Sequence, residues 1–149
     1  MGDFDAKLRP HLEGLLDRGE ALEGMCACSQ QKSLFTGGAV ALGVTRDRLI
    51  VQPLNRRGDP SGDSLSLAPG DIVSAEAQGA GGGWPEVGPA IMDHAAVKLR
   101  LRLADGEKLN LMLMRGEGAL GLGKLGGGEA QRRGVEALAA WFERAAAAR

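Results

Sequence analysis

The sequence predicts a mainly β domain in which about seven antiparallel strands are closed by a C-terminal helix. Three observations lead to this fold class. The segments 38–54 and 97–113 each hold two strand-like runs around a short polar corner. The segment 129–149 carries an apolar stripe at helical spacing. The 24 glycines require many turns, which favours short strands over long helices.

Length and composition favour a single domain over residues 1–149. A chain of 149 residues can bury about two-thirds of the surface that it exposes when unfolded. Within this domain we expect an N-terminal helix over 1–19, barrel strands over 20–115, a Gly-rich connector over 116–128 and a capping helix over 129–149.

The N-terminal helix is predicted from apolar residues at spacings of three and four, namely Phe4, Leu8, Leu12, Leu15 and Leu16. Proline fits best near a helix start, so Pro10 predicts that the firm part runs over 10–18. Gly19 then suits the left-handed residue that follows a helix.

The middle of the chain predicts short strands separated by turn residues. We expect a first strand over 21–29, a turn over 34–38, and strands over 40–45 and 49–54. A loop over 56–63 precedes a short strand at Leu65 and Leu67 and another that begins at Ile72. The run 79–83 is expected to be a flexible stretch, closed by Trp84 and Pro85.

The late hairpin, 97–113, allows its register to be predicted. A two-residue loop would pair Arg102 with Leu109 and mix charge into the apolar face. A three-residue loop over 104–106 avoids this, because a slip of one residue inverts every side chain. Gly106 supplies the left-handed residue that such a loop needs. The predicted pairs are Leu101 with Leu109, Leu99 with Leu111, and Val97 with Leu113.

Charge and hydropathy narrow the classes of partner. Lys and Arg number 18 against 19 Asp and Glu, so no overall field attracts nucleic acid, and few aromatic side chains could stack on bases. No apolar run approaches 18 residues, and the N-terminus is acidic rather than that of a signal peptide. We therefore expect a cytoplasmic protein with no nucleic-acid partner, whose contact with membranes is at most peripheral.

Two glycine patterns resemble phosphate-binding loops. Residues 116–121 match G-x-G-x-x-G, and residues 118–124 match G-x-x-x-x-G-K. A dinucleotide fold needs a further parallel strand after the helix, and Leu125 replaces the hydroxyl residue of a P-loop. A linker is the favoured interpretation, with nucleotide or phosphate binding through Gly116–Lys124 as an alternative.

No combination of residues nominates catalysis, a metal or a cofactor. Cys26 and Cys28 share one face of the first predicted strand, where two small buried thiols are the simplest interpretation. Only His11 and His94 could complete a zinc site with them, and neither has a ligand-like spacing. We therefore expect no enzyme activity, no metal and no cofactor.

Basic residues gather at both hairpins. The late hairpin projects Lys98, Arg100, Arg102 and Lys108 from one face, and the early hairpin carries Arg46, Arg48, Arg56 and Arg57. Interspersed acidic residues favour a solvated exterior. The alternative is an anion or partner surface made of Arg46, Arg48, Lys98, Arg100 and Arg102, which could bind anionic lipid weakly.

Short motifs resemble those of one known family. The corner Thr45-Arg46-Asp47-Arg48-Leu49 resembles the Thr-x-x-Arg-Leu corner common in bacterial pleckstrin-homology-like (PH-like) domains. Leu16-x-x-Gly19-Glu20 resembles the entry to the first strand in that family, and 65–67 followed by Asp71-Ile72-Val73 resembles its next step. The match spans 16–149 and departs at 79–83 and in the Gly-rich run before the last helix.

This resemblance implies a bent, seven-stranded antiparallel barrel or sandwich, capped at an open end by the C-terminal helix. It implies a non-enzymatic binding or assembly module, most simply for a protein or peptide, and some such domains form symmetric oligomers. Lipid binding in eukaryotic relatives uses basic residues in the first hairpin loop, where this chain has Lys32 alone.

Overall fold

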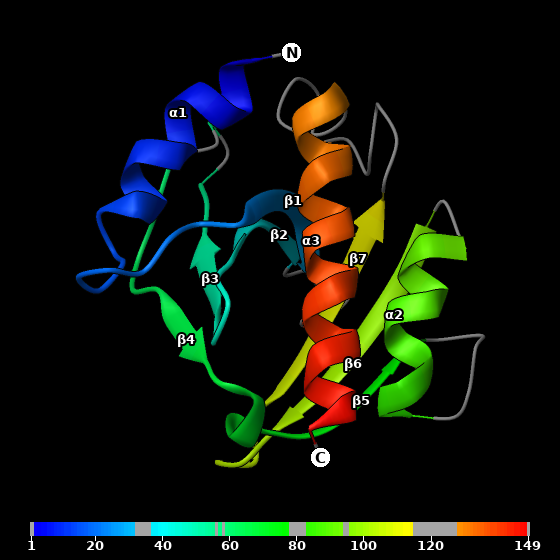
Figure 1. Cartoon of the computed structure of the whole chain (residues 1–149). Helices are drawn as coiled ribbons and strands as arrows, with labels where there is room; N and C mark the ends of the chain where they lie inside the picture. Colours follow the sequence, from blue (N-terminus) through cyan, green and yellow to red (C-terminus); the bar gives the residue numbers. More distant parts are fainter. Residues whose placement is uncertain are drawn as a thin grey trace.

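An antiparallel sheet curls around two helices, while a third helix lies on its outer side (Figure 1). The computed structural model describes residues 2–31, 37–55, 57, 59–77, 83–93, 96–114 and 128–148. Within these ranges the elements are α1 (Gly2–Glu13), β1 (Gly24–Gln31), β2 (Gly37–Val44), β3 (Leu49–Pro53), β4 (Leu65–Leu67), η1 (Pro69–Asp71), β5 (Ile72–Ala77), α2 (Trp84–Asp93), β6 (Ala96–Leu103), β7 (Lys108–Met114) and α3 (Gly128–Ala147).

The seven strands that these residues form lie in the order β4-β3-β2-β1-β7-β6-β5, and every neighbouring pair is antiparallel. β4 and β5 follow each other in sequence but form the two edges of the sheet, joined by η1. The predicted fold class, a mainly β antiparallel barrel or sandwich of seven strands with a C-terminal helix and a short N-terminal helix, is confirmed as a curled, open half-barrel.

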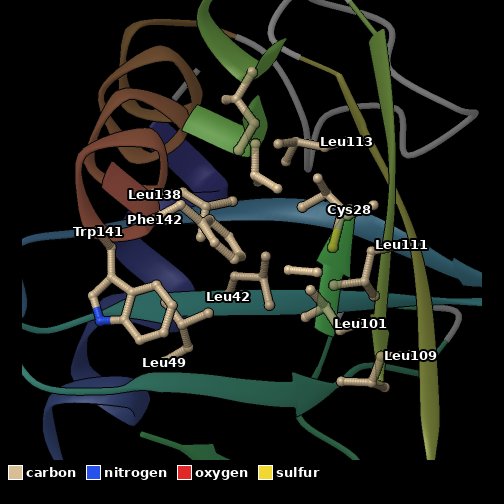
Figure 2. Packing of buried hydrophobic residues seen from close by; sticks show 14 of the residues in the cluster. Cys28, Leu42, Leu49, Leu101, Leu109, Leu111, Leu113, Leu138, Trp141 and Phe142 are labelled. Carbon is tan, nitrogen blue, oxygen red and sulfur yellow. The ribbon is translucent and has the colours of Figure 1, made fainter. Parts of the chain in front are cut away.

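The inner side of the sheet holds the main core, which α3 and α2 fill (Figure 2). Alternate strand residues point inward, as the two-residue period of a strand requires. From α3, the side chains of Leu138, Trp141 and Phe142 pack against them, each at most 1% exposed. Trp141 and Phe142 meet edge to face, with ring centroids 5.2 Å apart. Trp141 is therefore a core residue.

The outer side of β1–β3 carries a second, smaller core beneath α1. Leu8 and Leu12 of α1 are fully buried there, against Met25 and Ala27 of β1 and Ile50 of β3. These β1 residues alternate with the two cysteines, which face the inner core. The helix α1 therefore covers the part of the outer face that β1, β2 and β3 make.

Two side chains, those of Lys7 and His11, make polar contacts that hold α1 in place. Lys7 Nζ donates to the Arg57 carbonyl at 2.9 Å and pairs with the Asp59 carboxylate at 2.7 Å. His11 Nε2 donates to Gln52 Oε1 at 3.0 Å. These contacts tie the helix to β3 and the loop after it, so α1 is anchored to one end of the sheet.

Three predictions for the elements change. The N-terminal helix runs over Gly2–Glu13, with Pro10 inside it rather than at its start, because packing of Leu8 and Leu12 outweighs the cost of the proline. Gly19 has φ 84° but lies in a separate turn beyond the helix. Residues 84–93, predicted only as the close of a flexible stretch, form α2. The turn expected over 34–38 lies mainly outside the described residues.

The late hairpin confirms its predicted register. Leu101 pairs with Leu109, and the pairs Leu99–Leu111 and Val97–Leu113 also form. Gly106 has φ 92°, the left-handed conformation that the three-residue loop requires. The inner face of this hairpin is consequently built from Val97 and six leucines of β6 and β7, each at most 6% exposed: Leu99, Leu101, Leu103, Leu109, Leu111 and Leu113.

Candidate functional site

The outer face of β5, β6 and β7 presents the basic residues of the late hairpin. Lys98, Arg100 and Arg102 alternate along β6 with buried residues, so the three cationic side chains leave the sheet on the side opposite α2 and α3. Arg100 and Arg102 are exposed and Lys98 is half-buried. The sequence prediction that these three share one face is met by this geometry.

Both neighbouring strands add side chains to this face. On β7, Lys108 lies opposite Arg102, Asn110 opposite Arg100, and Met112 opposite Lys98. On β5, Ser74 lies opposite Arg102 and Glu76 opposite Arg100. We call this surface the basic face and define it by Ser74, Glu76, Lys98, Arg100, Arg102, Lys108, Asn110 and Met112.

Charge on the basic face is poorly neutralised. Arg100 Nη1 lies 3.7 Å from Glu76 Oε1, but both side chains are about half exposed, and such pairs contribute little. Arg102 and Lys108 are like charges directly opposite each other, an arrangement that destabilises a sheet. Within the described residues, the side chains of Lys98, Arg102 and Lys108 have no hydrogen-bond or ion-pair partner.

Arg48, the second arginine of the early hairpin, has a different environment. Its Nε donates to Glu20 Oε2 at 2.9 Å and its Nη2 to Glu20 Oε1 at 2.7 Å, a two-pronged pair. Nη2 also donates to the Leu15 carbonyl and Nη1 to the Ser66 hydroxyl. The side chains of Arg48 and Glu20 are 20% and 15% exposed. All three guanidinium nitrogens are therefore engaged within the chain.

This pair shifts the pKa of both groups. Hydrogen bonding from Arg48 lowers the pKa of Glu20 from 4.5 to about 2, with help from the Asp17 N–H. Hydrogen bonding to the Glu20 carboxylate raises the pKa of Arg48. Both groups stay charged at neutral pH, so the pair joins the segment before β1 to the corner between β2 and β3.

The corner itself is shaped by Thr45. Its hydroxyl accepts from the Arg48 N–H and donates to the Arg48 carbonyl, each at 3.1 Å, and its own N–H donates to that carbonyl at 3.0 Å. Thr45 is fully buried. These contacts turn the backbone so that the Arg48 side chain points toward Glu20.

Arg46 is exposed at the same corner but is distant from the basic face. Lys98 lies opposite Met112, Met112 opposite Ser29, and Ser29 opposite Ala39. Arg46 follows Ala39 by seven residues, which is about 20 Å of strand. The five residues predicted as one anion or partner surface thus separate into the β6 row, the bonded Arg48, and an isolated Arg46.

The remaining candidates from the sequence form no site among the described residues. Burial raises the pKa of Cys26 to about 12 and that of Cys28 well above 9.0, so neither thiol is a ready nucleophile or metal ligand. His11 bonds Gln52, while His94 and the loop Gly116–Lys124 lie outside the described residues. The described residues contain no group of three or more His, Cys, Asp or Glu placed to hold a metal ion.

Sequence reasoning did not find the partner of Arg48 or the limits of the basic face. Glu20 lies in the motif before the first strand, and Arg48 lies in the corner motif. One ion pair therefore joins two motifs of the resemblance. A search for opposite charges within those motifs could have found it. Ser74 and Asn110 have no signal of their own, because only strand pairing places them beside the arginines.

No protein-family model matches the chain, and no curated protein matches it. Solved structures do match. The chain is 12% identical to the hSac2 domain from human phosphoinositide phosphatase Sac2, with a TM-score of 0.54, and the match covers 97% of this chain and 80% of that chain. This likeness shows the fold alone, which is that of PH-like domains.

Two further solved structures have lower TM-scores. One is the C-terminal domain of an unknown protein from Leishmania infantum, at 15% identity and a TM-score of 0.43, covering 76% of this chain and 83% of that chain. The other contains the linker-DH/PH domains of p115-RhoGEF, at 10% identity and a TM-score of 0.46, covering 99% of this chain and 37% of that chain. Membership of the bacterial branch of PH-like domains stays a prediction.

Proposed function

We propose that the chain is a non-catalytic binding or assembly module that docks a protein or peptide on its basic face. The observation that carries the proposal is the uneven cover of the sheet. The helices α2 and α3 fill the inner side, and α1 covers β1–β3 on the outer side. The outer side of β5–β7 keeps unneutralised cations instead. PH-like folds also serve widely as binding modules, although fold alone does not assign function.

Two properties of the described residues support a non-catalytic role in the cytoplasm. Both cysteines are buried free thiols with raised pKa, which suits a reducing compartment and argues against nucleophilic chemistry. The Arg48 side chain forms an ion pair with Glu20 inside the fold rather than facing a ligand. None of the helices formed by the described residues is long and apolar enough to cross a membrane.

A capture experiment with matched charge reversals tests the proposal. The full chain, an Arg102→Glu/Lys108→Glu variant and an Arg46→Glu/Arg132→Glu control would be immobilised and exposed to lysate of the source cells. Both variants change charge equally at exposed positions, but only the first alters the basic face. We expect a protein that the wild type and the control retain and the face variant loses, and that rebinds when purified.

Retention of the same proteins by all three chains would overturn the proposal, as would capture of none. Self-association is the alternative form of assembly, and light scattering on the same three chains would measure it. A wild-type oligomer that the face variant alone dissociates would identify a second copy of the chain as the partner.

A further inference from the structure

We infer that the basic face binds an acidic protein segment in extended conformation, with carboxylates at every second residue. This inference rests on the proposed function and names the chemistry of its partner. Arg100, Arg102 and Lys108 of the basic face are exposed, and its cations Lys98, Arg100 and Arg102 follow the direction of β6. A ligand that uses them together must be long, and its negative charges must match their spacing.

The spacing of the cations sets the spacing of the ligand. Lys98, Arg100 and Arg102 are two residues apart on a strand, so their side chains leave the sheet about 7 Å from one another. A second extended chain laid along β6 presents alternate side chains at the same interval. Three carboxylates on such a chain can therefore each meet one cation without bending the backbone.

The pair Arg102 and Lys108 locates the strongest attraction for an anion. The two cations face each other across the β6–β7 ladder, and the neighbour of Arg102 on its other side is Ser74. No acidic residue of the cross-strand positions relieves this repulsion, whereas Arg100 has Glu76 beside it. A carboxylate placed between Arg102 and Lys108 would accept hydrogen bonds from both and remove the repulsion.

Discrete carboxylates suit this face better than a charged bilayer does. Glu76 lies among the cations, and the turn between β6 and β7 adds Asp105 and Glu107. A bilayer responds to the mean charge within a Debye length of about 8 to 10 Å, and these acids lower that mean. A peptide can instead place each negative charge beside one cation and uncharged residues beside the acids.

The probes are two fluorescein-labelled peptides of about ten residues, each made of about four Glu and about six Thr, with the alternating run of the first peptide followed by Thr so that the compositions match. One has Glu at every second position and the other at every third, which turns successive carboxylates to opposite sides of an extended chain. Anisotropy would be followed with the wild type, with Arg100→Ser/Arg102→Ser, with Lys98→Ser/Lys108→Ser, and with the control Arg46→Ser/Arg132→Ser. All substituted side chains are exposed or half-buried, and thermal unfolding would verify that each variant folds.

We expect the alternating peptide to bind the wild type and the control equally, and each face variant about tenfold more weakly. Binding should weaken as salt rises above about 0.1 M. Equal affinity for the two peptides, or no binding of either, would overturn the inference, as would binding only to vesicles that contain phosphatidylserine. If captured proteins still depend on the basic face while neither peptide binds, this inference fails and the proposed function stands.

Discussion

The pair Glu20–Arg48 shows how a basic residue in a motif can serve the fold. Its guanidinium meets a carboxylate and a carbonyl from the connection between α1 and β1, and a hydroxyl from β4. Four of the five N–H donors of this arginine are thus used within the chain, which leaves little to recognise a ligand. Arg100 and Arg102 differ from Arg48 in their neighbours. Strand pairing places neutral or like-charged residues beside them, and the one acidic neighbour, Glu76, forms only a weak ion pair with Arg100. The local partners of a charge, rather than the charge itself, decide which arginines form a surface.

At the residue scale we predict that Glu20 and Arg48 are strongly coupled in stability. Urea unfolding of Glu20→Gln, Arg48→Lys and the double variant should give a coupling energy of about 1–3 kcal/mol near pH 7, because lysine cannot form the two-pronged pair. The folded Glu20 has a pKa of about 2 against an ordinary 4.5. Its contribution is therefore complete above pH 4.5 and is lost as the pH falls toward 2.

The control for this prediction is Arg46→Lys, which changes an exposed arginine at the same corner that the described residues leave without an ion pair. It should leave stability unchanged. Additive effects in the double variant, or the same acid sensitivity in Glu20→Gln as in the wild type, would show that the pair does not stabilise the fold.

At the scale of elements, α3 is fixed to β1 by an unusually close approach. The Gln131 side chain accepts from the Ala27 N–H at 2.8 Å and donates to the Ala27 carbonyl at 2.9 Å. Its amide thereby bonds β1 at the position beside the last ladder pair with β7, Cys28–Leu113. One turn further along α3, Gly134 lies directly against the Met25 backbone. A glycine and a glutamine thus let a helix pack on a strand with its backbone groups bonded.

We predict that Gly134→Ala destabilises the protein although alanine favours a helix. An added Cβ would overlap the Met25 carbonyl, which is backbone and cannot swing aside. The overlap should outweigh the gain in helix propensity, which is about 1 kcal/mol, and give a net loss of about 2 kcal/mol. Chemical unfolding followed by tryptophan fluorescence would measure it, since Trp141 is in the core.

The matched control is Gly70→Ala, because a Cβ at Gly70 would meet nothing within 4 Å. That variant should be neutral. Stabilisation by Gly134→Ala would contradict the close approach of α3 to β1.

Elements differed in how far their sequences predicted them. The late hairpin was predicted to the exact register, because its alternating leucines tolerate one pairing only. The helix α2 was missed, because Pro85, Gly88 and Pro89 disfavour helix locally, while its stability comes from packing on α3. The β6 row of the candidate site was predicted from alternation. Its separation from Arg46 was not, because strand order decides distance across a sheet and no local pattern encodes it.

At the scale of the whole molecule, the two sides of one sheet have different tasks. The inner side is closed by residues of α3, and Trp84 of α2 joins them through a ring contact of 5.7 Å with Phe142. The outer side is divided between the small core beneath α1 and the basic face. Neither core includes the basic face, so the face variants should change binding without unfolding the chain.

The division between the two sides predicts that the protein cannot fold without α3. Removal of residues 128–149 would expose the inner leucines of β6 and β7, because the open half-barrel does not enclose them by itself. The fragment 1–127 should be insoluble, or should show no cooperative unfolding by circular dichroism. A milder test is Phe142→Ala, which should cost about 3–5 kcal/mol because that ring is fully buried, beside Glu136→Ala as an exposed control in the same helix. A soluble 1–127 fragment that unfolds cooperatively would contradict this role, because the strands and α2 would then suffice to bury the inner face.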